Sequence, residues 1–115
     1  MGRLIVLDAS VAIAALAGRR RSHRTATVAL AAANDDERVV AATTRAEILV
    51  GPSRVGGVAF ATARNFVDGC ATIAVTASIT DDTAALRARQ RTLSLPDAIA
   101  LVVANLIDAD AAWTF

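Results

Sequence analysis

The sequence predicts an α/β protein in which a mainly parallel sheet carries helices on both faces. Short apolar runs of the kind that form buried strands alternate along the chain with longer stretches of helical periodicity. Alanine is abundant, whereas aromatic residues make up only 3% of the chain, and this composition favours helices over an all-β fold. The 115 residues, 55% of them hydrophobic, are enough for one buried core. We therefore expect residues 1–115 to form a single domain.

The first half of the chain predicts two strands and three helices. Residues 4–7 are continuously apolar and predict a buried strand that stops at Asp8. Ser10 is expected to cap the helix that follows, which ends at Gly18. The next expected elements are a helix over 25–33, a strand over 38–42, and a helix that starts at Thr44 and closes at Gly51-Pro52. Thr44 and Glu47 have the spacing of a capping box, which predicts the start of that last helix.

The second half predicts two more strands and three more helices. A glycine pair at 56–57 breaks the chain before the next helical stretch. The expected elements are a helix over 58–68, a strand over 72–76, a helix that Thr80, Asp81 and Asp82 start and that runs to about Arg91, a helix from Ser94 to Ile107, and a strand over 111–115. Ser94 and Pro96 are a strong start signal for the last helix. Because residues 98–107 are apolar nearly all round, we expect that helix to be buried.

Composition limits the chemistry that the chain can perform. Every basic residue apart from His23 is arginine, which excludes reactions that need a lysine amine. The net charge of +1 is too small for nucleic-acid binding by overall charge, although a local basic patch can still act. Cys70 has no second cysteine for a disulfide, and one histidine with one cysteine cannot build a zinc cage. Asp8 interrupts the apolar amino-terminal region, so a secretion signal is not expected, and we predict a cytoplasmic protein.

Three acidic residues are expected at one edge of the sheet. Asp8 directly follows the first strand, Glu47 heads the helix after the second, and Asp97 heads the helix before the last. Ligands of parallel sheets bind beyond the carboxyl ends of the strands, which is where these side chains would lie. Three carboxylates without cysteine or histidine indicate a site for Mg²⁺ or Mn²⁺, an ion that orients a phosphodiester and activates water.

Each of these residues also has an ordinary structural interpretation. Asp8 is a plausible turn residue at the end of a strand, and Glu47 is the acidic half of the predicted capping box. Asp97 suits the positive end of a helix dipole. Their joint placement favours the functional interpretation over three separate structural ones.

Three motifs follow one another along nearly the whole chain: LDASVAI at 7–13, TRAEILVG at 44–51 and LPDAIA at 95–100. Together they resemble the motifs of PIN-domain nucleases, and in particular those of the VapC toxins of bacterial toxin–antitoxin pairs. The resemblance implies a three-layer sandwich with a mainly parallel sheet of four to five strands. It also implies that Asp8 and Asp97 bind Mg²⁺ or Mn²⁺, that Glu47 completes the catalytic set, and that Ser10 steadies Asp8. The implied activity is metal-dependent endoribonuclease cleavage of RNA by a homodimer that a cognate VapB-like antitoxin inhibits.

The chain departs from the family pattern at its carboxyl end. A fourth acidic residue of the family follows the segment matched here by residues 112–115, and this chain stops at Phe115, so the domain is expected to be truncated there. The alternative interpretation is a catalytically weakened PIN-like binding module that lacks this acid. A receiver-like phospho-accepting domain is disfavoured, because the chain has no lysine and no acidic pair after the first strand.

The segment 19–24 is the most basic part of the chain. It contains four arginines around the one histidine, His23. These arginines suit contacts to RNA phosphates, which would make binding salt-dependent, and they suit a solvated surface loop equally well. His23 itself is expected at the surface.

Overall fold

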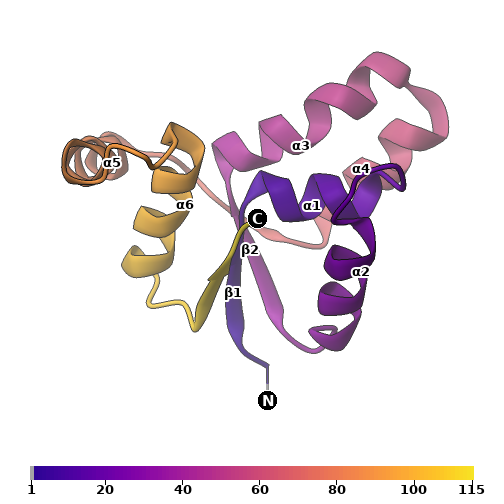
Figure 1. Ribbon diagram of the computed structural model, residues 1–115, viewed down its shortest axis with the longest axis horizontal. Helices are drawn as coiled ribbons and strands as arrows, with labels where there is room; N and C mark the ends of the chain where they lie inside the picture. Colours follow the sequence, from indigo (N-terminus) through magenta and orange to yellow (C-terminus); the bar gives the residue numbers. More distant parts are fainter. Residues whose placement is uncertain (1) are drawn as a thin grey trace.

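A computed structural model describes residues 2–115 as three layers, with a central sheet and helices on both of its faces (Figure 1). The elements in chain order are β1 (Leu4–Leu7), α1 (Ala9–Leu16), α2 (His23–Ala32), β2 (Glu37–Ala41), α3 (Ala42–Val55), α4 (Gly57–Asp68), β3 (Ala71–Ile73), α5 (Ala77–Arg89), α6 (Leu95–Leu106) and β4 (Ala111–Trp113). The predicted α/β class is confirmed. None of the helices within residues 2–115 is both long and apolar enough to cross a membrane.

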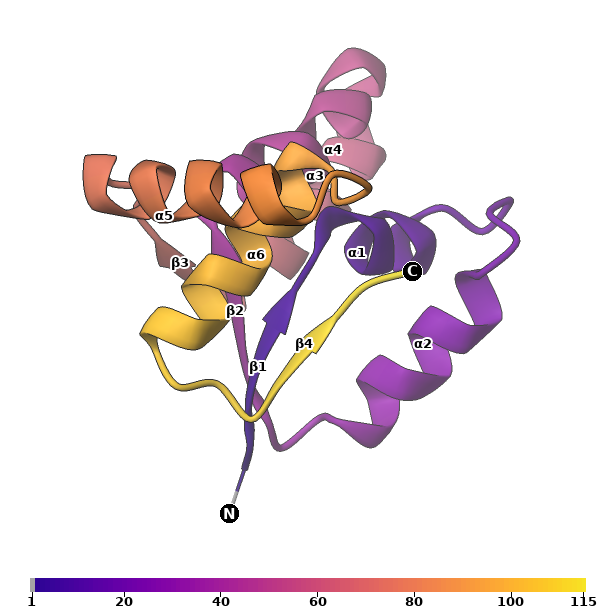
Figure 2. The same ribbon diagram turned by 60° about the vertical axis from the view of Figure 1, so that its left-hand side comes forward.

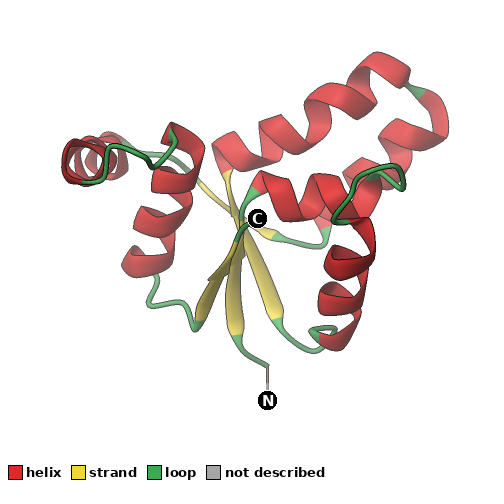
Figure 3. Ribbon diagram, in the orientation of Figure 1, coloured by secondary structure: helices red, strands yellow, loops and turns green. Residues whose placement is uncertain are grey.

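The sheet has the strand order β3-β2-β1-β4, and every pair of neighbours is parallel (Figure 3). In the central strand β1, Ile5 and Leu7 point to one face and Val6 to the other, and all three are fully buried. The first face packs against α1 to α4, and the second packs against α5 and α6 (Figures 1 and 2). Burial on both faces explains why this strand reads as a continuous apolar run instead of an alternating one.

The register places two chain segments together at the carboxyl edge of the sheet. Leu7 pairs with Trp113, so the residues that follow them, Asp8 and Thr114, leave the sheet side by side. The backbone N–H of Asp8 donates to the Trp113 carbonyl at 2.9 Å. Both views show the carboxyl terminus beside α1 (Figures 1 and 2).

The start of α3 differs from the predicted capping box. The helix begins at Ala42, directly after β2, with Ala41 in the N-cap position and no capping bond from that side chain. Thr44 is instead buried against the core, 1% exposed, and Glu47 lies in the second turn. The capping-box prediction was wrong because the strand passes into the helix without a turn, which moves the helix start two residues upstream.

The end of α3 also differs from the prediction. The helix runs through Gly51 and Pro52 to Val55, and it ends at Gly56, whose φ of +76° is a conformation that favours glycine. Gly51 has no Cβ to clash with the ring of Pro52, so the residue before this proline keeps its helical conformation. The predicted break at the glycine pair is confirmed.

The ends of α5 and the surface of α6 correct two further expectations. Thr76 caps α5 by accepting a hydrogen bond from the Ile79 N–H at 3.3 Å, so Asp81 and Asp82 lie within the helix and not at its start. In α6, Leu101 is 43% exposed and Leu106 is 63% exposed. The prediction of a fully buried α6 was therefore wrong in part, because the β-sheet and α5 together cover only some of its faces.

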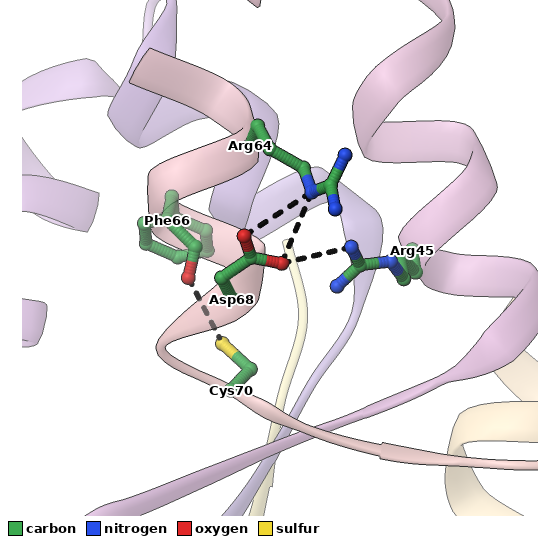
Figure 4. Close-up of polar contacts among 5 residues, drawn as sticks. All are labelled: Arg45, Arg64, Phe66, Asp68 and Cys70. Carbon is green, nitrogen blue, oxygen red and sulfur yellow. Dashed lines mark hydrogen bonds and ion pairs between the residues drawn. The ribbon is translucent and has the colours of Figure 1, made fainter. Parts of the chain in front are cut away.

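An ion-paired cluster links α3 to α4. Asp68 accepts hydrogen bonds from Arg45 at 2.9 Å and from Arg64 at 3.1 Å (Figure 4). These contacts, from Arg45 first, lower the pKa of Asp68. Cys70 lies at the end of the same helix, where its Sγ donates to the Phe66 carbonyl at 3.6 Å. Because these ion pairs are accessible to solvent, they orient α3 and α4 relative to each other more than they stabilise the fold.

Candidate functional site

Asp8 is the most constrained carboxylate of the site. It is 5% exposed and occupies the N-cap position of α1, where its Oδ1 accepts the Ala9 N–H at 2.7 Å. Its Oδ2 accepts the Ser10 hydroxyl at 3.0 Å and the Thr114 hydroxyl at 2.8 Å. A buried carboxylate requires such donors, because an unpartnered charge away from water is costly. Asp8, and not Ser10 as expected, therefore caps α1.

Ser10 connects Asp8 to the segment after β4. Its Oγ donates to Asp8 and accepts the backbone N–H of Phe115 at 3.1 Å. The expected hydrogen bond between Ser10 and Asp8 is thus present. Thr114 is a residue that the sequence interpretation missed, since an isolated threonine after a strand belongs to no motif. The one signal for it was its place one residue beyond β4, the strand that pairs with β1.

Asp97 lies in the first turn of α6, at the same edge of the sheet. The Ser94 hydroxyl accepts the Asp97 backbone N–H at 3.2 Å, which confirms the predicted helix start. Interaction with the Asp8 side chain is the first cause that raises the pKa of this carboxyl, and partial burial acts in the same direction. The predicted proximity of Asp8 and Asp97 is therefore present.

Glu47 faces the other two carboxylates from the second turn of α3. Desolvation raises the pKa of Glu47 most, and the charges of Asp8 and Asp97 raise it further. Since no capping box exists there, the ordinary interpretation of Glu47 as a capping residue is removed. Its perturbed pKa beside two further acids is a feature of functional sites.

The three acids do not form a closed ligand cage. Within residues 2–115, no three side chains of histidine, cysteine, aspartate or glutamate are close enough together to hold a metal ion jointly. Asp8 is the main influence on the Asp97 carboxyl, and Glu47 interacts with both acids through its charge. The arrangement is a cluster of mutually repelling carboxyl groups that a cation would stabilise.

The basic segment that follows α1 is also near this edge. Arg20 and Arg21, together with Ser10, line a pocket of about 300 Å³. His23 is half-buried and its Nδ1 bonds to the Ala14 carbonyl at 2.8 Å, so the expectation of a surface histidine was wrong. The imidazole is held there because α2 starts against α1.

The family and the fold of this chain have counterparts among known proteins. The model of the PIN domain family matches residues 5–115. A comparison with curated protein sequences gave no match. Among solved structures, the VapC20 toxin of Mycobacterium tuberculosis, described as cleaving the sarcin–ricin loop, has 22% identity and a TM-score of 0.79 over 96% of this chain and 88% of that chain.

Two further solved structures are similar. A toxin–antitoxin complex from Klebsiella pneumoniae has 26% identity and a TM-score of 0.74, over 93% of this chain and 82% of that chain. VapBC2 from Rickettsia felis, bound to a DNA fragment from its promoter, has 16% identity and a TM-score of 0.62, over 94% of this chain and 84% of that chain. The match to the family model spans nearly the whole described chain, and the solved structures share its fold, so this chain belongs to the PIN-domain family.

Proposed function

We propose that this protein is a metal-dependent endoribonuclease and the toxin of a VapBC-type toxin–antitoxin pair. The observation that carries the proposal is the interaction among Asp8, Asp97 and Glu47 at the carboxyl edge of the sheet, where Asp8 raises the pKa of both other acids. In an open parallel sheet this edge is the usual position of a ligand site. Membership of the PIN-domain family and the resemblance to toxin–antitoxin structures support the nuclease assignment.

The donor set suits a hard divalent cation such as Mg²⁺ or Mn²⁺. Asp8 uses three of its roughly four acceptor positions for the Ala9, Ser10 and Thr114 donors, which leaves about one for a cation. Asp97 offers a second carboxylate that interacts with Asp8, and the site contains no thiolate or imidazole that would favour a softer metal. Asp8 and Asp97 would therefore hold the ion. When bound, it would polarise an RNA phosphodiester and activate water.

The residues of the chain itself would orient the reaction. The Ser10 and Thr114 hydroxyls fix the Asp8 carboxylate, so this side chain is already ordered before a substrate arrives. Glu47 is more exposed than Asp8, and its raised pKa brings the carboxylate closer to the range of a base that accepts a proton from water at its Oε atoms. The proposed reaction is in-line attack of a water on a phosphodiester held at this edge.

The proposed partner is a VapB-like antitoxin that inhibits the enzyme by covering this edge. The structures that resemble this chain include a toxin–antitoxin complex and a VapBC assembly on promoter DNA, which supports such a partner. We further propose that the chain acts as a homodimer, as the family resemblance implies.

The test is cleavage of a mixed set of structured RNAs by the purified protein. Reactions contain Mg²⁺, Mn²⁺ or EDTA, and Asp8→Ala serves as the inactive variant, with its fold checked by circular dichroism. Cleavage that requires a divalent cation and is lost in Asp8→Ala would support the proposal. A folded protein that binds RNA or an antitoxin peptide but cleaves nothing would instead identify a catalytically weakened PIN-like binding module.

A further inference from the structure

A pocket of about 300 Å³ lies beside the carboxylate cluster, between α1 and the loop that leads to α2. Its lining residues are Ser10, Ile13, Ala14, Arg20, Arg21, Ser22 and Phe115. Ser10 belongs to both places, because its hydroxyl also donates to the Asp8 carboxylate at 3.0 Å. Ser10 therefore links the pocket to Asp8, and the lining of the pocket includes two arginines next to an acidic site.

The loop that carries these arginines is ordered by several hydrogen bonds. The Arg20 N–H donates to the Ala17 carbonyl at 2.9 Å, and the His23 N–H donates to the Arg20 carbonyl at 3.1 Å. The His23 imidazole then bonds through Nδ1 to the Ala14 carbonyl at 2.8 Å, and this nitrogen must be the donor because a carbonyl only accepts. These hydrogen bonds connect the loop to the Ala17 and Ala14 carbonyls at the end of α1, so the backbone that carries the arginines stays next to the site.

The electrostatics of the pocket favour a phosphate. Guanidinium groups bind phosphate oxygens in a planar, two-pronged geometry, and Arg20 and Arg21 are both lining residues of this pocket. Ser22 is the N-cap residue of α2, so the positive end of that helix faces the same space. Arg20 and Arg21 supply positive charge, and the N-terminus of α2 adds to the positive electrostatic potential that favours an anion.

We propose that Arg20 and Arg21 form a subsite for a backbone phosphate of the RNA strand, adjacent to the phosphodiester at the carboxylates. This inference rests on the proposed function, since it assigns a binding position to the same substrate. A cluster of three acids repels a polyanion, and a neighbouring cationic pocket compensates for that repulsion and sets the direction in which the strand leaves the site. Ser10 then connects the two positions, because it orients Asp8 and lines the phosphate pocket.

The experiment measures RNA binding separately from cleavage. A fluorescently labelled structured RNA is titrated with protein in EDTA, and anisotropy gives Kd between about 50 and 200 mM salt, a range over which phosphate contacts change affinity strongly. The variant is Arg20→Gln with Arg21→Gln. The matched control is Arg54→Gln with Arg89→Gln, which removes the same charge from the last turns of α3 and α5. Thermal unfolding checks that both double variants are folded.

We expect the Arg20/Arg21 variant to bind RNA about tenfold more weakly at 100 mM salt, and the slope of log Kd against log salt to fall by about 0.7 for each phosphate that the variant no longer binds. The Arg54/Arg89 control should change Kd less than twofold. Replacing Arg20 and Arg21 by lysine should keep most of the salt slope but weaken binding, because lysine retains the charge and loses the two-pronged geometry.

Equal effects of the two double variants would overturn the inference, since only overall charge would then matter. It would also be overturned if RNA binding were unchanged while binding of a poly-glutamate peptide fell, which would assign the pocket to an acidic protein segment. A wild-type protein that binds RNA through Arg20 and Arg21 without cleaving it would uphold the subsite and remove the proposed catalytic function alone.

Discussion

The Thr114 hydroxyl donates a 2.8 Å hydrogen bond to Oδ2 of Asp8, although 106 residues separate the two in the chain. The parallel pairing of β1 with β4 brings them together, because Leu7 and Trp113 are partners in the register. Ser10 donates to the same oxygen. The orientation of the buried carboxylate therefore depends on the last strand of the sheet as well as on α1.

Replacing Thr114 by valine should lower RNA cleavage about tenfold and leave the fold intact. Valine has a similar shape but cannot donate to Asp8, and a hydrogen bond to a charged group contributes about 1.5 kcal/mol. Thr114→Ser keeps the hydroxyl and should restore most of the rate. Initial cleavage rates of both variants in Mg²⁺, beside thermal unfolding, provide the measurement. Equal rates for Thr114→Val and the wild type would show that this contact does not position Asp8.

Replacing Glu47 by glutamine should raise the melting temperature in EDTA at pH 7 by about 1–3 °C. Desolvation and the charges of Asp8 and Asp97 raise the pKa of Glu47 above its ordinary value. In the pH window between the ordinary and the raised pKa, the folded state therefore binds more protons than the unfolded state. Stability consequently falls as pH rises through the window, and the neutral variant escapes this loss.

The gain from Glu47→Gln should shrink as pH falls below the ordinary glutamate value, where both states are protonated. Asp82→Asn, an exposed acid in the middle of α5, is the matched control and should not show this dependence. Thermal unfolding at pH 7 and pH 4 distinguishes the two. A lower melting temperature for Glu47→Gln at pH 7 would mean that Glu47 makes a stabilising contact instead.

The ion pair between Arg3 and Asp36, which lies just before β1 and β2, should make the stability of the protein fall at acidic pH. The Arg3 N–H donates to Asp36 Oδ1 at 2.7 Å, and its guanidinium donates to Oδ2 at 3.0 Å. The backbone hydrogen bond from Arg3 is the main cause that lowers the pKa of Asp36, so the stabilisation is present above the ordinary aspartate value and is lost as pH falls through the lowered one.

Asp36→Asn should therefore melt below the wild type at pH 7 and at the same temperature near pH 2. The neighbouring exposed residue Asp35 provides the control substitution, Asp35→Asn, for which no such difference is expected. Melting curves at several pH values test this. A difference that persists at the lowest pH would assign the effect to the shape of the side chain and not to its charge.

Cys70 should react slowly with thiol reagents in the folded protein. Its side chain is 8% exposed, and burial raises the pKa of the thiol, so little of the reactive thiolate is present at neutral pH. The rate of reaction with an aromatic disulfide reagent should rise at least about tenfold after unfolding in guanidinium. Equal rates in the two states would contradict the burial of this residue.

Much of the site could be predicted because its signals are local. Asp8 directly follows an apolar run, and Asp97 stands three residues after a capping serine. In a parallel sheet the carboxyl ends of all strands lie at one edge, and the helices run back antiparallel to the strands. Residues at strand ends and at the starts of the following helices therefore meet at that edge. Glu47 was placed at this edge because its helix follows the second strand, which is confirmed, whereas the capping box predicted at the start of that helix is absent.

The rest of the site depends on long-range contacts that no local pattern encodes. Thr114 becomes significant only because β4 pairs with β1, and its own residue type is ordinary for a strand end. Arg20 and Arg21 looked the same as any solvated basic loop until the pocket with Ser10 distinguished them. His23 was misjudged because its contact with the Ala14 carbonyl depends on how α2 packs against α1.

The most direct test of the carboxylate site is the RNA cleavage rate of Asp97→Asn in Mg²⁺, compared with the wild type and with Asp81→Asn. Both variants remove one acid at nearly constant shape, and Asp81 lies on α5 outside the cluster. We predict that Asp97→Asn lowers the rate at least about 100-fold, since it weakens the position of both the cation and the reacting phosphodiester, while Asp81→Asn stays near the wild type. Unchanged, cation-dependent cleavage by Asp97→Asn would contradict the assignment of the catalytic site.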